Sequence, residues 1–89
     1  LLLHLLKWVY QPTGRGSSWE ISIRRERDDI PEHLDENPGL KPRRQELFEK
    51  AYRTARLEAA RETGLRLATF PEACPFTLEQ ALDPDFWPE

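Results

Sequence analysis

Hydrophobic positions divide the chain into segments with distinct periodicities. In residues 1–10, eight of the ten side chains are apolar. Pro12 disfavours helical geometry in the residue before it, and the nearby Gly14 and Gly16 favour a loop. The pattern therefore predicts a helix that ends near Tyr10 and a loop over residues 13–17. A helix that is apolar on nearly all sides needs neighbours on more than one face.

A second helix is predicted from Ser17, which forms a capping-box pattern with Glu20. Its apolar positions are spaced by four, seven and four residues, which keeps them on one helical face; they are Trp19, Ile23, Ile30 and Leu34. Pro31 falls inside this pattern and removes one backbone donor, so we expect a kink or break over residues 28–30. The helix should end by Asn37.

The longest uninterrupted helical pattern covers residues 41–63. Pro42 suits a first helical turn, and Gly64 supplies the usual left-handed terminator. One face of this helix is apolar, and its alanines allow a neighbouring helix to approach closely. The residues of that face are Leu47, Phe48, Ala51, Tyr52, Ala55 and Ala59.

The C-terminal region, residues 65–89, contains four of the eight prolines and predicts an extended wrap. Within it, Thr77 and Gln80 form a second capping-box pattern, which predicts a short terminal helix to about Leu82. The predicted fold class is all-α: a small helical bundle with a proline-rich C-terminal wrap. Residues 1–89 are too few for more than one domain.

The chain opens inside the first apolar helix, with no capping residue before it and no methionine in the sequence. We therefore expect an upstream segment to pack against this helix. On this interpretation, residues 1–89 form the C-terminal part of a larger helical domain.

Charge is arranged in four blocks of alternating sign. Residues 1–27, 28–37, 38–66 and 67–89 carry net charges of +3, −5, +4 and −5. Alternating blocks can neutralise one another when the chain folds back on itself. Local positive charge is therefore weak support for a nucleic-acid partner.

Two features bear on the cellular compartment. The opening apolar stretch runs for about ten residues and is interrupted by His4 and Lys7, whereas a membrane span needs roughly 20. No membrane association is expected. Cys74 is the only cysteine, which excludes an internal disulfide and a cysteine-rich zinc module and favours the cytoplasm.

Candidate catalytic chemistry is sparse. His4, His33 and Cys74 have no partners at the spacings of known metal or nucleophilic sites. The glycine-containing turn over residues 13–17 lacks the preceding strand that a phosphate-binding loop needs. We therefore assign no catalytic residue, no metal ligand and no cofactor from the sequence.

Arg27 lies on the apolar face of the second predicted helix. A buried guanidinium must find an acidic or carbonyl partner, unless it lies at the edge of the face. We expect a structural network around Arg27, and we hypothesise that it reaches the upstream segment.

Several short stretches match one known family in both order and spacing. Together they resemble the bacterial family named domain of unknown function 29. The resemblance covers nearly the whole chain and implies an all-helical fold with a further N-terminal helical segment. Pro31 and Pro42 are less typical of the family, which has no established activity, so no catalytic residues are implied. The matching stretches are His4 to Trp8, Tyr10 to Pro12, Ser18-Trp19 with Arg27, Ala59 to Gly64, Phe70 to Pro75 and Thr77 to Gln80.

The aromatic content points to a function in binding. Aromatic side chains are enriched in protein–protein interfaces and anchor them, although they also pack in cores. We predict a non-catalytic protein–protein interaction module whose partner is another protein or a second copy. One alternative is a nucleic-acid-associated helical protein, from the arginines of the second and third helices. Another is an enzyme with active groups mainly upstream, aided by His4 or Glu62. The candidate interface residues are Trp8, Tyr10, Trp19, Phe86 and Trp87.

Overall fold

Four α-helices account for most of the chain. The computed structural model describes residues 1–88, and every regular element in that range is helical. The predicted all-α fold class is therefore confirmed. The helices are α1 (Leu2–Tyr10), α2 (Ser17–Glu36), α3 (Arg44–Thr63) and α4 (Leu78–Leu82), with 3-10 segments at Pro12–Gly14, Pro38–Arg43 and Leu67–Thr69.

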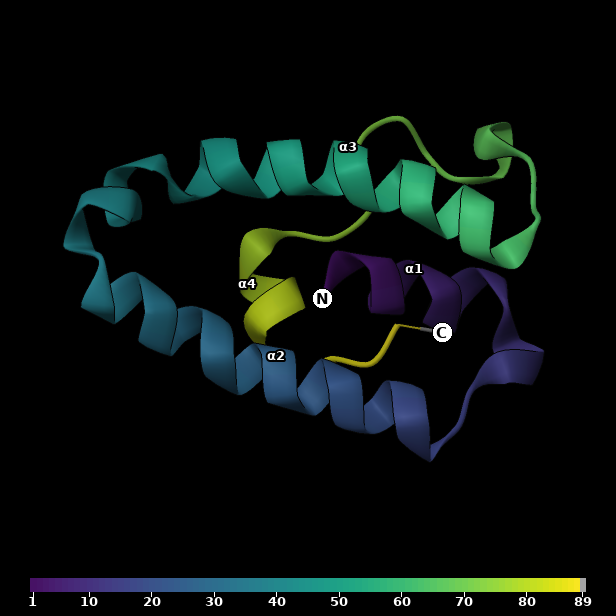
Figure 1. Ribbon diagram of the computed structural model, residues 1–89, viewed down its shortest axis with the longest axis horizontal. Helices are drawn as coiled ribbons and strands as arrows, with labels where there is room; N and C mark the ends of the chain where they lie inside the picture. Colours follow the sequence, from purple (N-terminus) through teal and green to yellow (C-terminus); the bar gives the residue numbers. More distant parts are fainter. Residues whose placement is uncertain (89) are drawn as a thin grey trace.

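The two long helices, α2 and α3, form opposite sides of the molecule (Figure 1). They are joined through Pro38–Arg43 and make little direct contact with each other. α1 lies between them and packs mainly against α3, with a smaller contact to α2. α4 and the C-terminal segment also lie between the long helices. The short helix α1 therefore acts as the spacer of the bundle.

The core forms where α1 meets the long helices. Leu5, Leu6 and Ile23 are completely buried, and Phe70 from the C-terminal wrap closes the same cluster. α3 contributes small residues at the contact, including Ala59, so α1 can approach its backbone closely. This burial accounts for the all-round apolar character of α1.

The start of α2 differs from the sequence prediction. The helix begins at Ser17, but its cap is Gly16 and no side chain caps it. The predicted Ser17–Glu20 capping box is therefore wrong. The reason is that Ser17 already lies inside the helix, while the Glu20 carboxylate accepts a hydrogen bond from Arg24 at 3.0 Å.

Pro31 does not break α2, so the predicted break is wrong, while the alternative of a kink stays a prediction. The helix is continuous from Ser17 to Glu36. Proline removes only one backbone donor, and the residues on either side are anchored on the same inward face by buried Ile23 and half-buried Leu34.

The ends of the later helices follow the sequence more closely. α3 starts at Arg44, three residues after the predicted Lys41, because the proline-containing segment Pro38–Arg43 winds as a 3-10 helix. Gly64 has a φ of 74° and ends α3 in the left-handed conformation, as predicted. The Thr77–Gln80 capping box is present with both of its hydrogen bonds.

Gly14 in the first connection packs beneath the indole of Trp19. A Cβ atom at this position would lie 2.4 Å from the ring, which is too close for any real contact. We predict that Gly14→Ala displaces Trp19 and lowers the free energy of unfolding by about 1–3 kcal/mol, as overpacking does. Urea denaturation measures this change.

The matched control is Gly39→Ala, because nothing lies near the added methyl group there. It should cause no loss of stability. Equal losses for the two variants would show that Trp19 does not pack on Gly14 in this way.

Tyr52 links α3 to the C-terminal wrap. Its buried hydroxyl donates a hydrogen bond to the carbonyl of Pro71. Burial raises the pKa of Tyr52 from 10.0 to about 12. The folded state therefore favours the neutral phenol.

This shift predicts an alkaline loss of stability. A raised folded-state pKa stabilises the fold below about pH 10, and the contribution disappears as the pH rises from about 10 to about 12. Urea denaturation across this range should show a steeper decline for the wild type than for Tyr52→Phe. Parallel declines would contradict the assignment, since all other titrating groups are common to both proteins.

Candidate binding groove

An open apolar groove lies between the C-terminal half of α2 and the N-terminal half of α3. Its volume is about 700 Å³. The walls and floor consist mainly of aliphatic side chains from all four helices and the first residue of the chain. Its apolar lining residues are Leu1, Leu2, Leu3, Ile30, Leu34, Leu47, Phe48, Ala51, Ala55, Leu78, Ala81 and Leu82.

The groove exists because the spacer helix covers only part of the space between the long helices. α1 separates α2 from α3, and its first residues form part of the groove floor. Towards Pro38–Arg43 the two walls continue, with half-buried Ile30 on α2 and half-buried Leu47 on α3. Apolar side chains on both walls are consequently left in contact with solvent.

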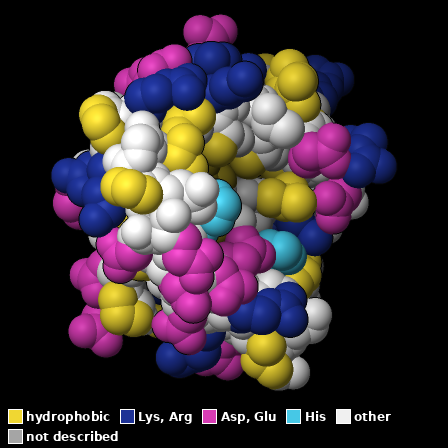
Figure 2. All heavy atoms as spheres, turned by 60° about the vertical axis from the view of Figure 1, so that its left-hand side comes forward, with side chains coloured by type: hydrophobic (Ala, Val, Ile, Leu, Met, Phe, Trp, Pro, Cys, Tyr) yellow, Lys and Arg dark blue, Asp and Glu magenta, His cyan; other side chains and the backbone are white. Residues whose placement is uncertain are grey.

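The charged rim is asymmetric. Arg44, Lys50 and Glu58 are the charged residues that line the groove, and all three come from α3. The opposite helix, α2, carries the acidic block of the sequence over residues 28–37. Figure 2 shows hydrophobic side chains around a hollow, with Lys and Arg gathered above it and Asp and Glu gathered below it and to its right.

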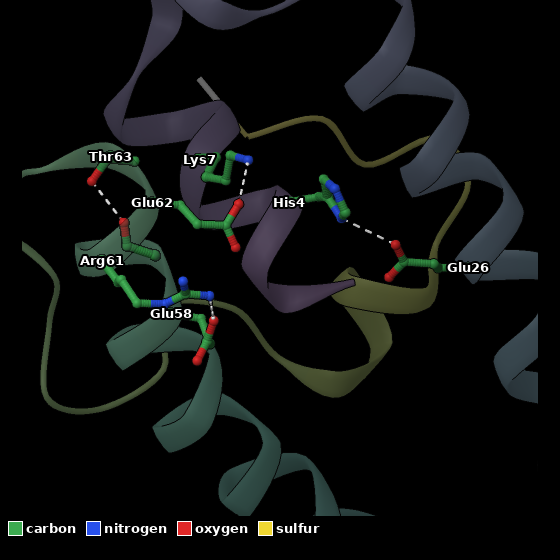
Figure 3. A network of polar contacts seen from close by, with 8 residues as sticks. His4, Lys7, Glu26, Glu58, Arg61, Glu62 and Thr63 are labelled. Atoms are coloured by element: carbon green, nitrogen blue, oxygen red, sulfur yellow. Dashed lines mark hydrogen bonds and ion pairs between the residues drawn. The ribbon is translucent and has the colours of Figure 1, made fainter.

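Two polar contacts to carboxylates fix α1 between the walls (Figure 3). Lys7 Nζ lies 3.1 Å from Glu62 Oε1 on α3, and His4 Nδ1 lies 3.0 Å from Glu26 Oε1 on α2. The polar residues of α1 therefore reach one carboxylate on each long helix. His4 and Glu62 were the residues predicted to assist catalysis if the protein is an enzyme. In the structure they contact different partners, Glu26 and Lys7.

Arg27 on α2 holds α4, which forms part of the groove floor. Arg27 is 4% exposed, and its guanidinium donates from Nε to the carbonyl of Ala81 at 2.9 Å and from Nη2 to that of Phe86 at 2.7 Å. Burial lowers the pKa of Arg27, and the charge of Asp83 partly opposes this effect. From the sequence we hypothesised that the Arg27 network reaches an upstream segment. The acceptors observed in the structure lie in the C-terminal segment.

The aromatic residues predicted as an interface pack largely within the molecule. Trp8 and Trp87 have ring centroids 4.9 Å apart, and the indole of Trp19 lies 4.9 Å from Lys7 Nζ. Tyr10 and Phe86 are likewise half-buried and contact aromatic rings of the core, at 5.1 and 6.1 Å between centroids. None of the five lines the groove. Their role in an interface stays a prediction.

The groove itself was not predicted from the sequence. Its residues were assigned to apolar helix faces, and such faces are normally covered by the fold. The sequence places Ala51 on the apolar face of α3, and only the structure shows that it is exposed. Recognising it required the positions of α2 and α3 relative to α1.

Potentially reactive side chains lie apart from one another. Cys74 is a half-buried free thiol whose pKa is raised by burial. His33 is exposed and lies next to Asn37 on α2. Over residues 1–88, no group of three or more His, Cys, Asp or Glu side chains is placed to hold a metal ion. Within the same range, no helix is long and apolar enough to cross a bilayer.

The Arg27 network generates a stability prediction. Arg27→Ala leaves buried carbonyl groups of the C-terminal segment unpaired, which costs about 1–3 kcal/mol. For a domain of this size we expect the melting temperature to fall by roughly 5–20 °C, measured by thermal denaturation with circular dichroism.

The neighbouring exposed residue Arg25 supplies the control. Arg25→Ala should change the free energy of unfolding by no more than about 0.5 kcal/mol. Hydrogen exchange should also accelerate in residues 78–87 of the Arg27 variant. A normal melting temperature with unchanged exchange there would refute the network's role.

Comparison with known proteins supports the family resemblance found in the sequence. The family described as Domain of unknown function DUF29 matches residues 1–87. No curated protein and no solved structure matches the chain. Because the match spans nearly all of the 89 residues, the chain belongs to the DUF29 family, whose description assigns no function.

Proposed function

We propose that this protein is a non-catalytic protein–protein interaction module that binds its partner in the groove between α2 and α3. The observation that carries the proposal is the continuous aliphatic lining of an open groove of about 700 Å³. Contiguous exposed apolar surface is characteristic of interaction sites. Covering this surface with another protein would remove it from water.

The distribution of arginines favours this function over nucleic-acid binding. Arg56 donates to the carbonyls of Phe70 and Leu67, and the guanidinium of Arg61 bonds to Glu58. A phosphate-binding helix needs a face of one sign that remains available to the phosphates. On α3 the basic side chains are mixed with acidic ones, and several are used within the fold.

Location in the bacterial cytoplasm is part of the proposal. Its support is the single cysteine, since a chain with one thiol cannot form the internal disulfides common in secreted small domains.

A groove-filling substitution tests the proposed function. Ala51 is exposed in the groove, so Ala51→Trp should occupy the binding space without disturbing the core. We expect the wild-type protein to capture a stoichiometric partner from an extract of its host, and the variant to lose at least nine-tenths of it. Quantitative mass spectrometry of the eluates provides the measurement.

Leu57→Trp is the matched control, because Leu57 is a 58% exposed residue of α3 that does not line the groove. This variant should retain the partner. Capture that is equally strong for all three proteins, or that vanishes after nuclease treatment, would contradict the proposal.

A further inference from the structure

We propose that the occupant of the groove is an amphipathic helix of a partner protein, with carboxylates beside its apolar stripe. This inference rests on the proposed function and specifies the chemistry of the partner. Three observations carry it: the length of the groove, the helix that already fills the adjoining space, and the charges left unpaired on the rim.

The length of the groove fits a helix. Its lining residues on α3 extend from Arg44 to Glu58, which corresponds to about 21 Å at the rise of 1.5 Å per residue. This is about four turns, a length that a short amphipathic segment spans when it binds through apolar anchors at i, i+3, i+4 and i+7.

α1 shows what kind of element the space between α2 and α3 accepts. It buries Leu5 and Leu6 against the bundle, while Lys7 and His4 reach carboxylates on the two walls. The same two walls continue into the groove with aliphatic residues on both sides. A second helix placed there would bury an apolar stripe and direct its polar flank towards α3.

The rim of α3 determines the charge of that flank. Glu58 is already bonded to Arg61. Within residues 1–88, neither Arg44 nor Lys50 forms an ion pair. Two cations without carboxylate partners, separated by about 9 Å along the helix, are complementary to two carboxylates on the occupant. Such complementarity gives specificity and excludes basic partners.

The test uses two synthetic helical peptides of 16 residues that share one leucine stripe. One carries two glutamates, about two turns apart, beside the stripe, and the other carries lysines at those positions. Fluorescence anisotropy of labelled peptides measures binding to the full chain. We expect the acidic peptide to bind at least tenfold more tightly, with a difference that shrinks as salt is added.

Charge reversal makes the test specific. In the double variant Arg44→Glu/Lys50→Glu the preference should invert in favour of the lysine peptide. Ala51→Trp should abolish binding of both peptides, and Leu57→Trp should leave both unchanged. Circular dichroism and thermal denaturation of each variant verify that it remains folded.

Equal affinity for the two peptides, failure of the charge reversal to invert the preference, or absence of binding would overturn the inference. Dimerisation of the chain that Ala51→Trp abolishes, measured by sedimentation, would also overturn the inference. Tight binding of the fatty acid laurate that displaces the acidic peptide would do the same. If Ala51→Trp still loses the captured partner while the peptides are not discriminated, the proposed function stands and only the acidic-helix inference fails. If Ala51→Trp captures the partner as well as the wild type does, the proposed function fails whatever the peptides show.

Discussion

The insertion of α1 between α2 and α3 is the constraint on which the rest of the structure depends. The two long helices make little contact with each other, so much of the buried surface that joins them is supplied by this nine-residue helix, together with the C-terminal segment. Leu5 and Leu6 supply completely buried apolar surface, each contributing about 1.5–3 kcal/mol. The carboxylates of Glu26 and Glu62 fix its polar side chains on either side. α1 is short and fills only part of the space between the long helices. The part that it leaves unfilled is the groove.

A second link couples the groove to the C-terminal segment. Arg27 projects from α2 and bonds to the backbone of Ala81 in α4 and to that of Phe86 beyond it. α4 has only five residues, so its own backbone hydrogen bonds cannot hold it in place. The buried guanidinium therefore positions the part of the groove floor formed by Leu78, Ala81 and Leu82. A charged residue on an apolar helix face is used here to fix one particular packing.

Local sequence signals predicted the elements better than their junctions. The first helix is recognised from ten consecutive residues, of which eight are apolar. The Gly64 terminator and the Thr77 capping box depend on interactions within a few residues. The structure contains all three features. The capping box at Ser17 was wrong because the helix already includes Ser17 and Glu20 pairs with Arg24 instead. The break at Pro31 was wrong because packing of the residues on either side keeps α2 continuous. The groove depends on the placement of three helices at once. Periodicity identifies an apolar face, but it does not tell whether the fold covers that face.

α1 keeps the halves of α2 and α3 that adjoin Pro38–Arg43 apart, so that the groove is a permanent feature of the free protein. The most direct measurement is the distance distribution between spin labels on these halves, at Glu32→Cys and Gln45→Cys in a Cys74→Ser background. Both positions are exposed and outside the groove lining. We predict a single narrow distance distribution that Ala51→Trp does not change. A second, shorter population in the free protein, showing that α2 collapses onto α3, would contradict it.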